Sequence, residues 1–166
     1  DFKLTMSMTP PLSSMLRDPL LQERYDVHLT QLEELLEKEI AYNEHNGHIK
    51  YLAEYYTKEF ANVRKVWEQY DGDLTKGFRK FLESGNLEII TCGATHGYLP
   101  LMKMYPEAVW SQIEVACQSH EETFGRRPSG IWLPECAYYE GLERMLADAG
   151  LRYFLTDGHG ILYARP

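Results

Sequence analysis

The chain has 166 residues, of which 44% are hydrophobic and 25% charged, and this globular composition excludes an intrinsically disordered chain. Its 17 Lys and Arg against 25 Asp and Glu give a net charge of −8, so the protein repels nucleic acid and anionic membrane surfaces. No apolar run in the sequence approaches the roughly 18–20 residues of a membrane span. We therefore expect neither nucleic acid nor membrane as a partner; the sequence does not indicate an oligomeric state.

The three cysteines, Cys92, Cys117 and Cys136, cannot all pair with one another, and none stands in a Cys-x-x-Cys motif. This usage argues against a disulfide framework or a zinc knuckle and is typical of a reducing compartment, so we expect a cytoplasmic protein. Nothing near Cys92 or Cys136 predicts a lowered thiol pKa, so a cysteine nucleophile is not favoured. The sequence lacks an initiator Met and opens on strand-like residues, which suggests entry part-way into a longer chain.

The first half of the chain is predicted to be one strand followed by a long helical stretch. Residues 3–9 alternate apolar and polar side chains and predict a strand, and Pro10-Pro11 predicts a loop after it. Asp18-Pro19 is typical of a helix start, because Asp accepts from the first free amides and Pro suits the first helical position. Apolar residues spaced by three and four then predict two long helices and a short third one, with breaks at Asn46-Gly47, Asp71-Gly72 and Gly85.

From residue 87 onward the pattern changes to short strands that alternate with helices, which predicts a parallel α/β sheet covered by helices. An open doubly wound sheet and a (β/α) barrel both fit this alternation. Because a barrel needs about 250 residues, the barrel alternative implies an incomplete barrel, with residues 18–84 as a helical insertion between the first two strands. The expected strands are 87–91, 130–133 and 153–156, the helices 106–124 and 140–149, and the loops 92–100 and 157–160.

Ligands of both architectures bind at the carboxyl ends of the strands, so the residues there are the candidates for a site. Glu135 is the strongest, because it directly follows an apolar strand and has Trp132 and Tyr138 close by in sequence. Aromatic faces stack on sugars, and a carboxylate beside them can act as a nucleophile or as an acid and base. The alternative is that Glu135 only caps the helix near residue 140 or faces water. The polar residues at the strand ends are Thr91, Thr95, His96, Glu135, Asp157 and His159.

Two further residues near the predicted strand ends have open alternatives. His96 is a candidate hydrogen-bond donor to a sugar hydroxyl, or simply a loop histidine bonded to nearby backbone. Glu88 lies inside an apolar strand. Because an unpaired buried charge is costly, Glu88 either faces a cavity, is paired, or lies on an exposed edge strand.

A metal site is not favoured. Asp157 and His159, taken with His96, are the candidate ligands, but their spacing matches no known metal pattern and Asp-Gly is common in turns. His28 and His120 fall on predicted helices, and we expect both to be solvated. We therefore expect no metal and no cofactor.

Two segments of the sequence resemble signature segments of glycoside hydrolase family 57. They are residues 85–100, Gly-Asn-Leu-Glu-Ile-Ile-Thr-Cys-Gly-Ala-Thr-His-Gly-Tyr-Leu-Pro, and residues 130–138, Gly-Ile-Trp-Leu-Pro-Glu-Cys-Ala-Tyr. Residues 154–160, Phe-Leu-Thr-Asp-Gly-His-Gly, are also similar. The resemblance extends from about residue 3 to the last residue and is greatest to the family's bacterial 1,4-α-glucan branching enzymes.

The resemblance implies a fold and a reaction. The implied fold is a (β/α)7-type barrel with inserted helices, of which residues 1–166 would be the N-terminal part, with the remaining barrel and a C-terminal domain absent. The implied reaction is retaining cleavage of an α-1,4-glucan and transfer of the cut piece to a 6-hydroxyl, which forms α-1,6 branches in glycogen synthesis. The implied partner is an α-glucan of the amylose or glycogen type, and the reaction requires no metal.

The resemblance also implies roles for residues. Glu135 matches the family nucleophile. His96 and Glu88 match the other signature segment and would line the donor-sugar subsite, which Trp132 and Tyr138 would shape.

The sequence departs from the family in two segments. The family's acid/base Asp lies in a segment similar to Tyr-Asp-x-Glu-Leu-Phe-Gly-His-Trp-Trp, which is absent here, as is an early His-x-Pro segment. Asp157 does not match the acid/base motif, so we do not assign that role to it. We therefore expect residues 1–166 alone to have little or no branching activity.

Alternative functions remain open at this point. Within the family they are an α-amylase or a 4-α-glucanotransferase, which share the nucleophile and differ in the acceptor. Outside it they are a metal-dependent carbohydrate deacetylase and a non-catalytic glucan-binding module.

Overall fold

The computed structural model describes residues 2–163 and divides the chain into two compact units. The first unit contains the residues up to Met15 and those from Phe78 onward, and the second contains Leu16–Gly77. The four strands found among residues 2–163 all lie in the first unit, and the second is helical. The predicted helical insertion between the first two strands is therefore confirmed.

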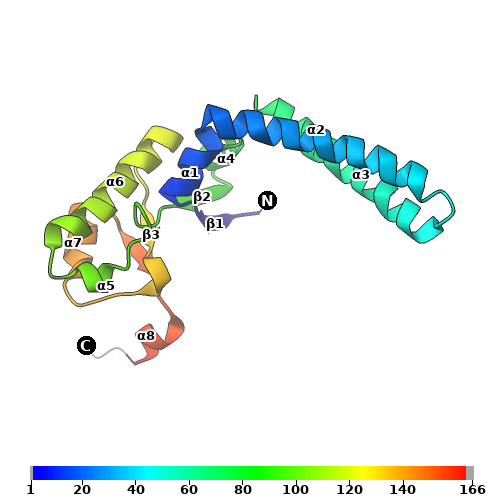
Figure 1. The fold of residues 1–166 in the computed structure, drawn as a ribbon. Coiled ribbons are helices and arrows are strands. Elements are labelled where there is room, and N and C mark those ends of the chain that lie inside the picture. Colours follow the sequence, from blue (N-terminus) through cyan, green and yellow to red (C-terminus); the bar gives the residue numbers. More distant parts are fainter. Residues whose placement is uncertain (1, 164–166) are drawn as a thin grey trace. The chain divides into compact units, whose positions relative to one another are not determined.

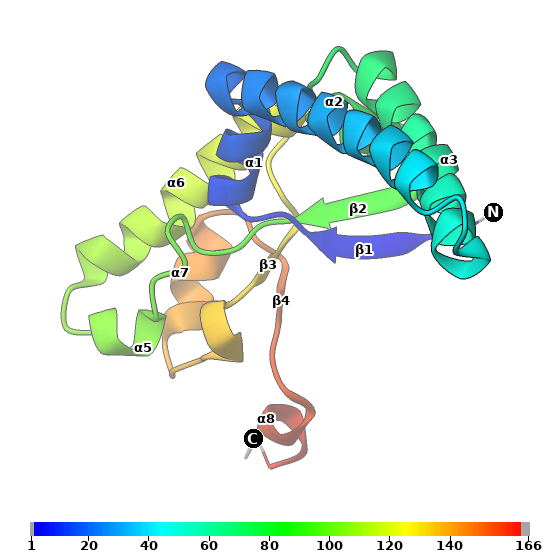
Figure 2. The same ribbon diagram turned by 45° about the vertical axis from the view of Figure 1, so that its right-hand side comes forward.

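The strands of the first unit pair in parallel. β1 (Leu4–Ser7) lies beside β2 (Leu87–Ile90), and β3 (Gly130–Trp132) lies beside β4 (Tyr153–Leu155) (Figure 2). A single parallel bridge between Thr91 and Ile131 joins β2 to β3. The prediction of parallel α/β strands is confirmed. Among residues 2–163 the strands do not close into a barrel, so the (β/α)7 arrangement stays a prediction.

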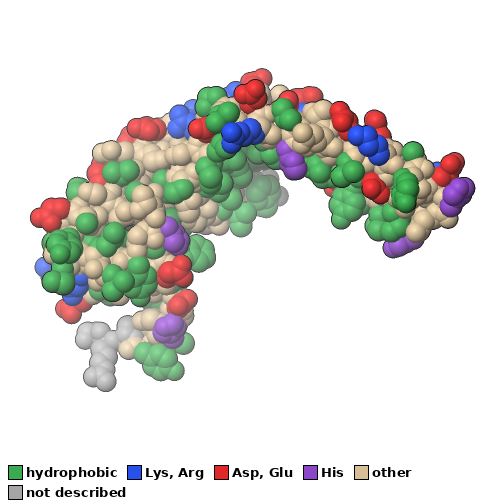
Figure 3. All heavy atoms as spheres, viewed as in Figure 1, with side chains coloured by type: hydrophobic (Ala, Val, Ile, Leu, Met, Phe, Trp, Pro, Cys, Tyr) green, Lys and Arg blue, Asp and Glu red, His purple; other side chains and the backbone are tan. Residues whose placement is uncertain are grey.

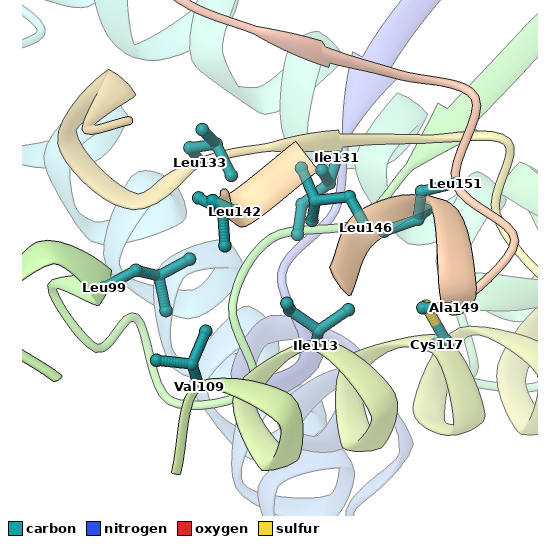
Figure 4. Packing of buried hydrophobic residues seen from close by; sticks show 10 residues of the cluster. All are labelled: Leu99, Val109, Ile113, Cys117, Ile131, Leu133, Leu142, Leu146, Ala149 and Leu151. Carbon is teal, nitrogen blue, oxygen red and sulfur yellow. The ribbon is translucent and has the colours of Figure 1, made fainter. Parts of the chain in front are cut away.

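The core of this unit forms between the strands and two helices, α6 (Pro106–Phe124) and α7 (Leu142–Asp148) (Figure 4). On α6 the buried side chains include Val109, Ile113, Cys117 and Phe124. The helix ends at Gly125, whose φ of 77° is left-handed and therefore suits glycine. The core cluster consists of Leu99, Val109, Ile113, Cys117, Ile131, Leu133, Leu142, Leu146, Ala149 and Leu151.

His120 on α6 is buried, so the expectation that it is solvated was wrong. Its Nδ1 lies 2.8 Å from the carbonyl oxygen of Arg126, and its Nε2 lies 3.0 Å from that of Ile89 on β2. Burial lowers the pKa of this imidazole and outweighs the two carbonyl contacts, which act in the opposite direction. A neutral imidazole carries a single N–H, so neutral His120 donates to one of these two carbonyl oxygens and not to both. His28 is exposed, as expected.

Two segments predicted as loops are helical. α1 (Pro10–Arg17) begins at the Pro10-Pro11 pair, and α8 (Gly158–Leu162) follows Asp157. Proline fits the first turn of a helix, because the amide hydrogen that it lacks would have no partner within the helix there. Thr9 also caps this start, since its Oγ1 accepts a 3.3 Å hydrogen bond from the Leu12 amide. A short helix, α5 (Leu99–Met102), also starts within the last predicted loop residues before α6.

The second unit is a helical hairpin of α2 (Pro19–Tyr42) and α3 (Gly47–Gln69), which run side by side (Figure 1). Both starts are capped, α2 by Asp18 as the sequence predicts and α3 by Asn46, which was predicted only as a break. Asp18 accepts a 3.0 Å bond from the Leu21 amide, and Asn46 accepts a 3.3 Å bond from the Ile49 amide. The shorter α4 (Thr75–Glu83) leads back to β2.

Arg64 on α3 clamps the hairpin. Its guanidinium donates to both Glu33 carboxylate oxygens at 3.0 Å and to Asp26 Oδ1 at 2.5 Å, both residues of α2. Trp67 also donates its indole N–H to Asp26 Oδ1 at 3.1 Å. Charged and hydrophobic side chains both lie along this hairpin (Figure 3). Within residues 2–163, no helix is long and apolar enough to cross a membrane.

Candidate active site

Two loops meet at the carboxyl ends of neighbouring strands, one after β2 and one after β3. The second contains the 3₁₀ turn η1 (Pro134–Cys136). Gly93 allows the loops to approach closely, because a Cβ at this position would lie only 3.0 Å from Pro134 Cγ. This approach brings together two predicted site residues, His96 and Glu135.

His96 and Glu135 are in direct contact. His96 Nε2 lies 3.2 Å from Glu135 Oε1, and the other ring nitrogen, Nδ1, lies 3.4 Å from the sulfur of Cys92. The side chains of His96 and Glu135 are 53% and 71% exposed. No Lys or Arg of the described residues forms an ion pair with Glu135, so its carboxylate is accessible and is not neutralised by a strong base.

The backbone at this contact is strained. His96, Glu135 and Cys136 have φ angles of 58°, 56° and 55°, in the left-handed region that residues with a Cβ rarely adopt. Each such residue costs roughly 1–2 kcal/mol. Hydrogen bonds from the Cys136 amide to Leu133 O at 2.8 Å and from the Ala137 amide to Pro134 O at 3.1 Å hold the turn. Asp71, just past the end of α3, is also left-handed with a φ of 51°, but only at the contact between His96 and Glu135 do three such residues lie together among residues 2–163.

Gln112 on α6 holds the loop that carries His96. Its side-chain oxygen accepts from the amides of Thr95 at 3.0 Å and Gly97 at 3.4 Å, and its side-chain nitrogen donates to Thr95 Oγ1 at 2.7 Å. Its main-chain oxygen accepts from the Ala94 amide at 2.9 Å. Gln112 was not predicted as a site residue from the sequence. A helical glutamine beside a buried isoleucine carries no signal that it bonds to a loop backbone.

The two aromatic candidates, which stand on either side of Glu135 in the sequence, have different partners. Trp132 is 44% exposed, and its indole N–H points to Cys136 Sγ at 3.3 Å. Tyr138, also 44% exposed, stacks on Phe154 with ring centroids 5.4 Å apart, and its hydroxyl donates to Glu143 Oε2 at 2.8 Å. That hydrogen bond raises the pKa of Tyr138, so its hydroxyl stays protonated. Both rings keep exposed surface.

Glu88 is not brought to the contact between His96 and Glu135. Its carboxylate accepts from Ser129 Oγ at 2.5 Å and from Thr5 Oγ1 at 3.1 Å. The bond from Ser129 is the main reason that the pKa of Glu88 is lowered. Thr91 is the first residue after β2, and Glu88 precedes it by three residues. Three residues of a strand span roughly 10 Å, so Glu88 lies about that far from the carboxyl end of the strand. Of the alternatives from the sequence, the structure supports the cavity, because the half-buried Glu88 lines a hollow together with Trp132.

The remaining candidates stay apart from this contact. Asp157 and His159 are exposed at the start of α8. Residues 2–163 contain no group of three His, Cys, Asp or Glu side chains arranged to hold a metal ion. Burial raises the pKa of the Cys92 thiol, so this cysteine is protonated and is a poor nucleophile.

Comparison with known proteins agrees with the resemblance. Residues 5–165 match Glycosyl hydrolase family 57. The chain is 30% identical to the 1,4-alpha-glucan branching enzyme TK1436 of Thermococcus kodakarensis, covering 94% of this chain and 25% of that protein. It is also similar to the crystal structure of the alpha-amylase AmyC from Thermotoga maritima, with 44% identity, a TM-score of 0.96, and coverage of 99% of this chain and 32% of that chain.

A third similar structure is the GH57-type branching enzyme of Pyrococcus horikoshii, with 29% identity, a TM-score of 0.85, and coverage of 92% of this chain and 32% of that chain. The chain thus spans between a quarter and a third of the length of these relatives. The family match covers nearly the whole chain, and the segments that carry the resemblance lie at the contact between His96 and Glu135. The chain belongs to glycosyl hydrolase family 57.

Proposed function

We propose that the full-length protein cleaves α-1,4-glucans with retention of configuration, with Glu135 as the nucleophile, and transfers the cut chain to a 6-hydroxyl as a branching enzyme. The observation that carries this proposal is the placement of Glu135. Its carboxylate is 71% exposed at a strained strand end, and His96 is its hydrogen-bond partner. An accessible carboxylate held by one donor meets the requirements of a glycosidase nucleophile.

The mechanism follows from these contacts. His96 holds Glu135 Oε1, which leaves Oε2 free to attack the anomeric carbon. The covalent glycosyl-enzyme then forms as the glycosidic bond breaks, and a second carboxyl group protonates the leaving oxygen. In retaining enzymes this group lies about 5–5.5 Å from the nucleophile, and it later deprotonates the acceptor hydroxyl. No residue of this sequence matches the family's acid/base motif, so that role stays unassigned.

The other predicted residues receive roles according to their positions. His96 orients the nucleophile at the donor sugar, and the exposed faces of Trp132 and Tyr138 supply stacking surface beside it. Glu88 acts at most from the amino-terminal half of β2, where Ser129 and Thr5 already occupy its oxygens.

Hydrolysis is the second candidate. It is favoured by the 44% identity to a structure described as an alpha-amylase, compared with 29–30% for the branching enzymes. Both reactions pass through the same glycosyl-enzyme at Glu135 and differ in whether a glucan hydroxyl or water accepts the sugar. The proposal is therefore tested in two steps, the nucleophile first and the acceptor second.

The first step replaces Glu135 by glutamine in the full-length gene product. We expect amylose turnover to fall by roughly 10³-fold or more, with glucan binding retained, because the amide has the carboxylate's shape without its nucleophilicity. Mass spectrometry of the wild-type enzyme treated with an activated fluoroglycoside should locate a glycosyl adduct on the peptide that contains Glu135. Glu107→Gln, an exposed glutamate on α6, is the matched control and should retain turnover. Wild-type turnover in Glu135→Gln would remove this residue as the nucleophile.

The second step measures the acceptor in the wild-type enzyme. A branching enzyme lowers the iodine staining of amylose while releasing few reducing ends, and its product yields short chains on enzymatic debranching. An amylase releases reducing ends in proportion to the lost staining. The second result would replace branching by hydrolysis and leave the role of Glu135 intact.

A further inference from the structure

Cys92 contacts the side of the His96 ring that faces away from Glu135. Its sulfur lies 3.4 Å from His96 Nδ1, and His96 Nε2 lies 3.2 Å from Glu135 Oε1. The imidazole is thus held at both nitrogens, by a thiol and by a carboxylate. Cys92 is 3% exposed, whereas the other two members of this chain of contacts are open to solvent.

The chemistry of the three groups determines where the protons lie. An ionised carboxylate only accepts hydrogen bonds, so Nε2 must carry the proton of the bond to Glu135. In a neutral ring Nδ1 then has a free lone pair and accepts from the Cys92 S–H. Burial raises the pKa of the Cys92 thiol, so the sulfur keeps the proton that this bond needs.

We propose that Cys92 is a positioning residue that fixes His96 as the neutral Nε2–H tautomer and so orients Glu135 for attack. This inference rests on the proposed function of Glu135. A neutral donor orients the carboxylate while leaving it more nucleophilic, because a charged imidazolium would attract the same oxygen more strongly and withdraw more of its charge. The thiol thereby selects the tautomer that serves the nucleophile, as buried partners of other functional histidines do.

The direct test is the protonation state of His96 in the full-length protein. Histidine labelled with ¹⁵N distinguishes the two neutral tautomers and the imidazolium, and the His96 signals are identified by their loss in His96→Gln. At about pH 7 we expect the Nε2–H tautomer in the wild type and in Cys92→Ser, whose hydroxyl also donates. In Cys92→Ala we expect a mixture that includes the Nδ1–H tautomer or the imidazolium. A wild-type spectrum of the Nδ1–H form or of the imidazolium would overturn the proposal, even if Cys92→Ala does not fold.

Activity provides the second readout. Loss of one hydrogen bond predicts that Cys92→Ala lowers kcat about five- to tenfold with KM little changed, and that Cys92→Ser restores kcat to within about twofold. Cys117→Ala is the matched control, because Cys117 is equally buried on α6 but belongs to the apolar core, and it should leave the His96 spectrum and kcat unchanged. Equal kcat values for Cys92→Ala and the wild type would refute the positioning role.

The two proposals fail in distinguishable ways. If Glu135→Gln keeps its turnover, the proposed function fails while the His96 tautomer can still be observed. If Glu135→Gln is inactive but the Cys92 variants change neither the tautomer nor kcat, only the role of Cys92 fails.

Discussion

Replacing Gly93 by alanine tests whether the close approach of the two loops is what brings His96 to Glu135. A Cβ at position 93 would lie 3.0 Å from Pro134 Cγ and 3.3 Å from Gln112 Oε1. Carbon atoms in contact are normally about 3.5–4.0 Å apart, so Pro134 must move by about half an ångström. If Glu135 follows, its 3.2 Å contact with His96 becomes about 3.7 Å, which is too long for an N–H···O hydrogen bond.

We therefore expect Gly93→Ala to lower kcat/KM on amylose about five- to tenfold, as for the loss of a hydrogen bond of about 1 kcal/mol. The measurement uses the full-length protein, with reducing-end release and iodine staining as readouts. Gly47→Ala is the control, because a Cβ at Gly47, the first residue of α3, has no atom within 4 Å and should leave activity unchanged. Wild-type kcat/KM in the Gly93→Ala enzyme would show that the contact does not depend on this approach.

Two further predictions concern stability. Arg64→Lys should lower the free energy of unfolding by about 1 kcal/mol in urea titrations, because a lysine ammonium cannot bond to Glu33 and Asp26 at once as the planar guanidinium does. The control is Lys38→Met, at the exposed pair with Glu34, which should change the free energy of unfolding by less than about 0.5 kcal/mol. Burial lowers the pKa of His120, so below about pH 6.5 the folded state binds fewer protons than the unfolded state. The free energy of unfolding therefore decreases as the pH is lowered through that range. The melting-temperature advantage of the wild type over His120→Gln should therefore shrink from about pH 7.5 to about pH 5; a constant difference would contradict the neutral assignment.

The helices of the hairpin were predictable because their signals are local. Asp18 and Asn46 cap the amides that follow them, so residue type and spacing identify both starts. Glycine at position 125 likewise marks the end of α6. Pro10-Pro11 was misinterpreted because proline suits a turn and a first helical turn equally well.

The contacts of Gln112 and His120 could not be predicted in the same way. Both side chains bond to main-chain groups of segments distant in sequence, and main-chain amides and carbonyls are the same for every residue type. Glu135 and His96 were predictable as candidates because strand ends gather ligand-binding residues. Their left-handed backbone was not, since neither residue is a glycine or an asparagine.

The openness of the site separates the cleavage chemistry from the choice of acceptor. The carboxylate of Glu135 and the ring of His96 are both more than half exposed among the described residues, so these contacts alone do not exclude water from a glycosyl-enzyme. Transfer to a glucan hydroxyl requires that an acceptor, and not water, occupies the open side of the carboxylate. We therefore expect the residues at this contact to serve amylases and branching enzymes alike. In that case substitutions at Cys92, His96 and Glu135 change the rate of both reactions together and leave their ratio constant, and a variant at one of these positions that shifts the ratio of branching to hydrolysis would refute this separation.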